Sequence, residues 1–406
     1  MSLIVQKYGG SSLADANKIR RVAQRIGSTY DKGNSVVAVV SAMGDTTDEL
    51  IELAHRVSDR PDEREFDLLL STGELVSCTL MAMALRSSGY QAISLSGAQA
   101  GIRTDKSHGK ARIAAVAPER IQGELDRGCI VIVAGFQGVT EDSDVTTLGR
   151  GGSDTTAVAL AASLGAERCE IYTDVEGIYT ANPRLVPEAH KLKEIGYEEM
   201  LELASYGVKM QPRSVELGML YNVPILVASS FSDAPGTLIH QGGDTSMELR
   251  NKVRGIATDT NVAKLSVLGV TDRPGIAASL FEPLAEASIS IDVIVQNASV
   301  DGSTDLTFTV SRSDLRKALD IVRPLVSNMG GRGLVSSDKL AKVSIVGTGM
   351  QNAPGFAARM FRALYEANIN IEMITTSEIR ITCIVQEDRI EEAARVLYRA
   401  FELDKE

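Results

Sequence analysis

Short apolar runs alternate with helix-like amphipathic stretches through the first 240 residues of the chain. Repetition of strand and helix predicts a mainly parallel sheet with helices on both faces. Sheets of this kind bind ligands in the loops at the carboxyl ends of their strands. The runs with the length of buried strands are 3–6, 35–40, 93–95, 130–134, 169–173 and 225–227, and helical patterns follow at 14–26 and from residue 48.

The pattern changes after a polar, glycine-rich stretch at 240–247, because the chain then repeats itself. Segments starting at Lys264 and Lys342 align with each other, and each has a Pro-Gly pair, an apolar helix and a strand. Their separation of about 80 residues is too long for a solenoid repeat and indicates a duplicated small domain. Each copy continues with a strand (305–310; 379–385) and a helix (313–326; 389–401), which is typical of a ferredoxin-like fold.

We therefore expect an α/β domain followed by two ferredoxin-like βαββαβ domains. A hydrophobic content of 44% with 23% charged residues fits a soluble globular protein. The predicted boundaries are 1–245 for the α/β domain, 246–262 for a linker, and 263–338 and 339–406 for the two copies.

Charge and composition argue against several classes of protein. The formal net charge of -11, without any block of basic residues, argues against a nucleic-acid partner. The first residues do not read as a signal peptide and no apolar run reaches the ~18 residues of a membrane span, so we expect a cytoplasmic protein without membrane contact. The four cysteines and four histidines are scattered, which predicts neither a disulfide framework nor a metal site.

A candidate phosphate-binding loop, KYGGSS at 7–12, lies between the first predicted strand and a helix. Glycine amides and a helix N-terminus attract phosphate, and a lysine such as Lys7 can neutralise its charge. A plain strand–helix turn explains this hexapeptide alone equally well. The chain has no GxxxxGK[ST] motif, so it is not a P-loop enzyme.

The segment GRGGSDTTA at 149–157 gives a stronger signal, since four small or acidic residues open a helix. Arg150 can hold a carboxylate with two parallel hydrogen bonds, and Asp154 can orient a lysine or contact a metal-bound nucleotide. An ordinary helix N-cap accounts for Ser153 or Asp154 but not for the preceding glycines. Two further segments, 41–47 (SAMGDTT) and 173–184 (TDVEGIYTANPR), also follow strands, although ordinary loops have similar compositions.

Together, these segments resemble the amino-acid kinase superfamily and, within it, the aspartate kinases. KYGGSS, SAMGDTTDEL, LSTGELVS, GRGGSDTTA and TDVEGIYTANPR occur in the family's order, followed by two ACT domains, and the resemblance covers the whole chain. It implies transfer of the γ-phosphoryl group of ATP, with nucleotide-associated Mg²⁺, to L-aspartate. That reaction is the first step towards lysine, threonine and methionine.

The resemblance also implies a role for each matching residue. Lys7 would stabilise the transferring phosphoryl group, Glu74 would bind the substrate ammonium, and Arg150 would bind its α-carboxylate. The implied catalytic residues are Lys7, Glu74 and Asp154; those for aspartate are Ser41, Thr47, Glu74, Arg150, Ser153 and Asp154; those for ATP are Lys7, Gly9, Gly10, Ser11, Thr173, Asp174, Tyr179, Arg184 and Lys209.

Two positions depart from the family pattern. Asn182 stands in TANPR where the family commonly has aspartate, which would alter affinity for ATP or magnesium. Only three residues separate Lys209 from Arg213, where family members usually have four. Loss of one helical residue rotates the rest of the helix by about 100°. The role of Lys209 is therefore less well supported than the role of Lys7.

The tandem ACT domains imply regulation by an amino acid. Because ACT domains resemble one another in pairing edge to edge and binding amino acids at the shared interface, we expect inhibition by lysine, threonine or both, and at least a homodimer. Ala357 stands where some relatives have a hydroxyl, which leaves the effector open, and Met247 is placed for the internal start that gives some family members a shorter regulatory subunit. The implied contacts are Asp272, Gly275, Ile276 and Ala277 before the first helix of copy one, Gln296 and Asn297 at its next strand end, Asn370 and Ile371 in the second strand of copy two, and Ser377 and Glu378 at that strand's end.

The chemistry implied here needs no general base. The β-carboxylate of aspartate has a pKa of about 4 and is already ionised at pH 7. Positioning and charge stabilisation then suffice. Two alternatives are a kinase for another acidic amino acid and a catalytically silent amino-acid sensor; the paired ACT domains argue against the first, and retention of Lys7, Glu74, Arg150 and Asp154 against the second.

Overall fold

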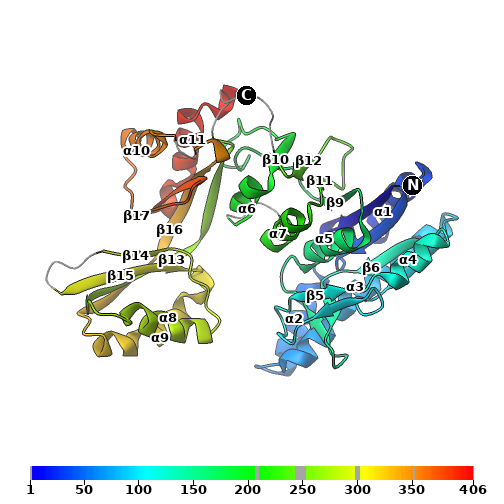
Figure 1. Cartoon of the computed structure of the whole chain (residues 1–406), viewed down its shortest axis with the longest axis horizontal. Helices are drawn as coiled ribbons and strands as arrows, with labels where there is room; N and C mark the ends of the chain where they lie inside the picture. Colours follow the sequence, from blue (N-terminus) through cyan, green and yellow to red (C-terminus); the bar gives the residue numbers. More distant parts are fainter. Residues whose placement is uncertain (1, 206–209, 243–252, 298–301, 351–352, 406) are drawn as a thin grey trace. The chain divides into compact units, whose positions relative to one another are not determined.

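The computed structural model describes residues 2–205, 210–242, 253–297, 302–350 and 353–405. The chain forms two compact units, Met1–Tyr179 with Lys191–Glu248, and Thr180–His190 with Leu249–Glu406 (Figure 1). Lys209 and Met247 lie outside the described residues, so the expectations attached to them stay predictions.

The first unit is an α/β domain with one large and one small sheet. Its strands are β1 (Leu3–Tyr8), β2 (Ser35–Val40), β3 (Ala92–Leu95), β4 (Ile102–Thr104), β5 (Ile113–Val116), β6 (Ile130–Ala134), β7 (Gln137–Val139), β8 (Val145–Thr147), β9 (Arg168–Thr173), β10 (Glu194–Gly196), β11 (Ile225–Ser229) and β12 (Thr237–His240). Its helices are α1 (Ala16–Asp31), α2 (Thr46–Val57), α3 (Glu63–Ser87), α4 (Glu119–Asp126), α5 (Gly152–Leu164), α6 (Tyr197–Ser205) and α7 (Pro212–Tyr221).

The large sheet has the order β10-β12-β11-β9-β1-β2-β6-β3, and every neighbouring pair is parallel except β11 with β12. Val36, Ala38 and Val40 of β2 share a hydrophobic core with α1 and α3, whereas α5 contacts β1, β2 and β9. Helices therefore cover both faces, which explains why β2 and β6 read as continuous apolar runs. The expected mainly parallel α/β fold is confirmed.

Helix α3 corrects one expectation from the sequence. It has 25 residues and is apolar enough to cross a membrane by length and composition, although no run of that kind was expected. Half of its most apolar window is buried inside the first unit, as in a core helix. It also carries two buried acidic residues, Asp67 and Glu74.

The second unit contains the repeated segments. Its strands are β13 (Gly255–Thr271), β14 (Ile294–Gln296), β15 (Ser303–Val310), β16 (Gly333–Val346), β17 (Met373–Thr376) and β18 (Arg380–Gln386). Its helices are α8 (Ile276–Glu286), α9 (Leu315–Asn328), α10 (Phe356–Glu366) and α11 (Ile390–Ala400).

These strands form one antiparallel sheet in the order β14-β15-β13-β16-β18-β17. The second half of β13 pairs with β15 and β16, and completes the first copy in ferredoxin-like order. The first half of β13 begins at Gly255, inside the expected linker 246–262, and pairs with β16 from Gly255–Val346 to Asp259–Lys342. Copy two therefore takes its fourth strand from residues that precede copy one in the chain.

Two ion pairs join the copies reciprocally. Lys264 Nζ lies 2.8 Å from a carboxylate oxygen of Glu372, and Lys342 pairs with Asp292. Lys264 and Lys342 begin the two aligned segments, while Asp292 and Glu372 follow equivalent isoleucines. The duplication thus places a lysine of each copy against an acid of the other.

Residues 180–190 pack with the second unit, although they were expected in the domain 1–245. Ala181 and Val186 are buried in the core of copy two. The Tyr398 hydroxyl of α11 lies 3.0 Å from Thr180 Oγ1 and also donates to the carbonyl of Glu188. Burial of these apolar side chains explains why residues 180–190 belong to the second unit rather than to the first.

Candidate active site

Four loops meet at the carboxyl ends of β1, β2, β9 and β11. The Gly44 amide donates to the Gly10 carbonyl over 3.0 Å, and a Cβ on Gly10 would lie only 2.8 Å from the Ala42 carbonyl, so only glycine fits there. Ser12 Oγ lies 2.7 Å from Ser230 Oγ, which brings the loop after β1 to the loop after β11. Ser230 was not anticipated, and its position just after an apolar strand is the signal that could have identified it.

Lys7 and Asp154 form a salt bridge of 2.6 Å at this edge, with side chains 12% and 11% exposed. Lys7 is on β1, and Asp154 is in the first turn of α5, whose N-cap is Gly151 in a left-handed conformation with φ 73°. Neither Ser153 nor Asp154 is therefore the helix cap. Asp154 thus contacts a lysine, as the sequence suggested. The N-terminus of α5 adds positive electrostatic potential beside this pair.

Glu74 of α3 is 3% exposed, and its two carboxylate oxygens differ in their surroundings. Oε1 accepts from the Ala42 amide over 3.2 Å, but Oε2 has no hydrogen-bond partner among the described residues. Burial raises the pKa of the Glu74 carboxyl to about 7. A cationic ligand beside Oε2 would restore the charged form.

The other residues implied for binding the substrate aspartate lie in or next to loops of the same domain. Ser153 is buried beside Gly135, where a Cβ would meet it at 2.8 Å, while Arg150 is exposed between β8 and α5. Ser41 follows β2 and its carbonyl accepts from Ser77 Oγ over 2.6 Å. Thr47 lies in the first turn of α2. These positions offer hydroxyl groups and one exposed loop arginine to a ligand.

The nucleotide candidates divide between the units. Thr173 Oγ1 donates to Asp174 directly after β9, Gly9 donates from its amide to the Tyr172 carbonyl, and Ser11 lies exposed in a short 3-10 turn. Tyr179 forms a β-bridge with Lys191. Arg184, by contrast, belongs to the second unit and is exposed there.

The effector candidates lie near both edges of the antiparallel sheet. Gly275 caps α8 with φ 89°, the side chain of Ile276 is buried in the core of copy one, and Ile371 packs against the core of copy two. Only backbone atoms of Ile276 can therefore face an effector. Asn370 and Ile371 precede β17 rather than lie in the second strand as expected. The other candidates, Asp272, Ala277, Gln296, Asn297, Asn370, Ser377 and Glu378, are exposed or partly exposed.

Comparison with known proteins identifies the class. A family model described as amino acid kinase family matches residues 2–229, and an ACT domain model matches 265–323 and 343–401. The chain therefore belongs to the amino acid kinase family, in a form with two ACT domains. Its relatives place it in the aspartokinase branch, whose members transfer phosphate from ATP to aspartate.

The relatives match along their whole length. Aspartokinase of Corynebacterium glutamicum is 52% identical over 410 residues, covering 100% of this chain and 97% of that protein. Aspartate kinase of Pseudomonas putida is 47% identical over 405 residues, covering 100% and 98%. The crystal structure of E. coli aspartokinase III in complex with aspartate and ADP is 26% identical with a TM-score of 0.80, covering 98% of this chain and 99% of that one. The resemblance inferred from the ordered motifs is confirmed.

Proposed function

We propose that the site described above binds MgATP and L-aspartate and transfers the γ-phosphoryl group to the β-carboxylate of aspartate. The observation that carries this assignment is the buried Oε2 of Glu74, unpaired among the described residues, at the carboxyl end of the parallel sheet. A buried carboxylate without a partner is costly, and an α-ammonium group supplies the missing charge. Aspartate then has its amino group held at a fixed point of the site.

Each remaining residue contributes binding or charge stabilisation. Arg150 holds the α-carboxylate with parallel hydrogen bonds, and Ser41, Thr47 and Ser153 supply hydroxyl groups to the substrate. Asp154 orients Lys7 through their salt bridge, so the ammonium of Lys7 faces the place where negative charge develops. Because aspartate attacks as a carboxylate, no protein group has to remove a proton.

The loop after β1 fits phosphate groups. Gly9 and Gly10 have no side chains to keep a phosphate away from the backbone, and the Gly9 amide donates to the Tyr172 carbonyl only over 3.4 Å. A Cβ on Gly10 would lie 2.8 Å from the Ala42 carbonyl, so this loop packs closely against the loop after β2. Thr173 ends β9, Asp174 and Tyr179 come after it, and all three provide polar contacts to the nucleotide. Arg184 and Lys209 are implied for ATP by the sequence alone. Mg²⁺ arrives with ATP and neutralises charge on its phosphates; among the described residues no group of three or more His, Cys, Asp and Glu could hold a metal ion.

A substrate survey tests this function. Release of ADP is measured with L-aspartate, L-glutamate and N-acetyl-L-glutamate at equal concentrations. Aspartate-dependent release well above the other two acids supports the assignment. Equal or faster release with either other acid would replace it with another kinase, and no release with any acid would favour the silent sensor.

The two edges of the antiparallel sheet are the basis for a proposal about regulation. β14 and β17, both labelled in Figure 1, are its outer strands. Each exposes an isoleucine, Ile294 at 53% and Ile374 at 44%. Exposed strand edges of this kind pair readily with another chain. We propose that two chains pair through these domains in the cytoplasm, that lysine, threonine or both bind at the interface, and that a shorter subunit with the same two domains can join the assembly.

A further inference from the structure

The hairpin between β4 and β5 has a tip, residues 105–112, that is closed by its own hydrogen bonds. The Asp105 amide donates to the Arg112 carbonyl over 3.1 Å. Asp105 Oδ1 accepts from the amides of Ser107 and Arg112, each over 3.1 Å. These hydrogen bonds hold the tip in one conformation. A contact on one side of the tip can therefore fix the position of a loop on its other side.

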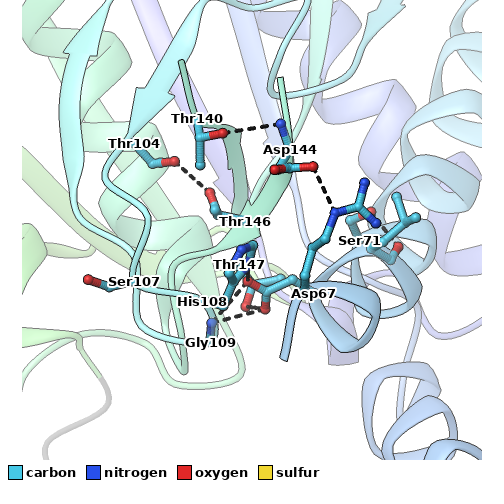
Figure 2. A network of polar contacts seen from close by, with 12 residues as sticks. Asp67, Ser71, Thr104, Ser107, His108, Gly109, Thr140, Asp144, Thr146 and Thr147 are labelled. Carbon is cyan, nitrogen blue, oxygen red and sulfur yellow. Dashed lines mark hydrogen bonds and ion pairs between the residues drawn. The ribbon is translucent and has the colours of Figure 1, made fainter. Parts of the chain in front are cut away.

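Asp67 of α3 fixes this tip from inside the domain. Its carboxylate is fully buried and accepts from the Gly109 amide over 2.9 Å and from Thr147 Oγ1 over 2.5 Å. His108 Nδ1 lies 2.8 Å from Asp67 Oδ2, within hydrogen-bond distance. Figure 2 shows His108, Gly109 and Thr147 converging on Asp67. Unlike Glu74, Asp67 has hydrogen-bond partners for both of its oxygens within the protein.

The same tip contacts the glycine loop that carries Arg150. A Cβ on Gly149 would lie 3.1 Å from the Gly109 carbonyl and 3.8 Å from Lys110 Cα, so the two loops touch directly. The Ala111 amide also donates to the Thr147 carbonyl over 2.9 Å. A continuous path thus runs from Asp67 through Gly109 to Gly149, one residue before Arg150.

Arg213 strengthens this connection from the other side. Its guanidinium donates to the Ala111 carbonyl over 3.0 Å and to the Leu148 carbonyl over 2.8 Å. One side chain therefore ties the hairpin tip to the residue before Gly149. The side chain of Arg150 is exposed. The direction in which this side chain leaves the loop therefore depends on the backbone that these contacts hold in place.

We propose that Asp67 and His108 are positioning residues for aspartate binding, because they hold the hairpin tip that shapes the loop of Arg150. This inference rests on the proposed role of Arg150. Neither residue touches the substrate; they act through Gly109 and Gly149. Loosening the tip should therefore weaken the binding of aspartate and leave the binding of ATP unchanged. A merely structural role would instead lower the stability of the protein and weaken the binding of both substrates.

Two substitutions at His108 test the proposal, since its side chain is 18% exposed and its removal leaves no large cavity. His108→Leu removes the donor to Asp67, and His108→Asn restores an N–H at the same distance along the side chain. We expect His108→Leu to raise KM for aspartate roughly tenfold, the effect of a small misplacement of a binding group, with KM for ATP unchanged. His108→Asn should return KM for aspartate towards the wild-type value, and Lys106→Met, on the same tip but paired with Asp142, should not change it.

Steady-state kinetics and calorimetric titration of aspartate are measured on the full chain, together with thermal unfolding. Wild-type KM for aspartate in His108→Leu would overturn the proposal, as would parallel increases for aspartate and ATP. Asp67→Asn provides a second test: if it folds, it should share the selective defect, and an unaltered aspartate affinity would contradict the inference. Wild-type protein without aspartate-dependent ADP release would instead refute the proposed function.

Discussion

Lys7 is the positive side chain that the structure pairs with Asp154 at the site. We predict that Lys7→Ala lowers kcat by on the order of 10²–10³, as for loss of one preorganised group that stabilises developing charge. Assays of ADP release at saturating ATP and aspartate measure the change. Lys32→Ala, at the exposed end of α1, is the matched control and should keep wild-type kcat. A Lys7→Ala enzyme with more than about half the wild-type rate would reject this role.

Glu74 should make aspartate binding depend on pH. Burial raises the pKa of its carboxyl to about 7, so at lower pH the free enzyme holds the protonated form. Because the substrate ammonium requires the carboxylate, KM for aspartate should rise as pH falls below about 7, by up to roughly tenfold per pH unit. The same raised pKa means that the unliganded protein loses stability as pH rises through about 7, since the folded state binds this proton more tightly.

Glu74→Gln is the control for this pH dependence. The amide cannot ionise, so KM for aspartate should be high and nearly constant with pH, and the unliganded variant should unfold at a higher temperature than wild type above pH 8. Initial rates and thermal unfolding in buffers of constant ionic strength give both readouts. A wild-type KM for aspartate that does not change with pH would contradict the assignment of Glu74.

The sequence could indicate Lys7, Arg150 and Asp154 because glycines and a helix start surround each of them locally. Asp67 and His108 could not be found in this way. Thr147 lies 80 positions and His108 lies 41 positions from Asp67, and no short spacing links them. Their relation exists only once α3, β8 and the hairpin have folded together.

At the scale of elements, the reciprocal ion pairs join the two copies of the repeat. The hydrogen bond from Lys264 lowers the pKa of Glu372. A lowered carboxyl pKa stabilises the fold above its unfolded value of about 4.5, and this contribution is lost as pH falls further. We predict that Glu372→Gln lowers the unfolding free energy by about 1 kcal/mol at pH 7 and that the difference shrinks as pH falls below about 4.5.

Urea unfolding at several pH values, monitored by circular dichroism, measures this contribution. Glu366→Gln, at the exposed end of α10, should match wild type throughout. A Glu372→Gln deficit that is equally large at low pH would mean that packing rather than the ion pair connects the copies.

The two copies of the repeat resemble each other in sequence, but their strands come from different parts of the chain. The duplication was readable because its two copies share Pro-Gly pairs and apolar spacing. The fourth strand of copy two was not, because residues 255–262 precede copy one and pair with β16 about 80 positions later, a distance that only tertiary pairing can bridge. Residues 180–190 were assigned to the first domain for the same reason, since their burial partners lie in α11.

At the scale of the whole molecule, amino acids that bind the ACT domains should inhibit the kinase. Inhibition requires an effector to prefer one of two states, with a typical coupling of ~1–3 kcal/mol. We predict that lysine, threonine or the pair at millimolar concentration lowers activity, and that Gln296→Ala or Asn297→Ala weakens this inhibition. Light scattering should show at least a dimer. Unchanged activity and melting temperature with either amino acid and with both would refute the regulatory proposal.

Hydroxylamine trapping identifies the product of the reaction. Purified protein is incubated with MgATP and either L-aspartate or L-glutamate in the presence of hydroxylamine, which converts an acyl phosphate to a hydroxamate. Aspartyl β-hydroxamate should form in proportion to ADP, and Glu74→Gln and Lys7→Ala should suppress both. Glutamyl hydroxamate in equal or greater amount, or ADP release without any hydroxamate, would contradict the assignment as an aspartate kinase.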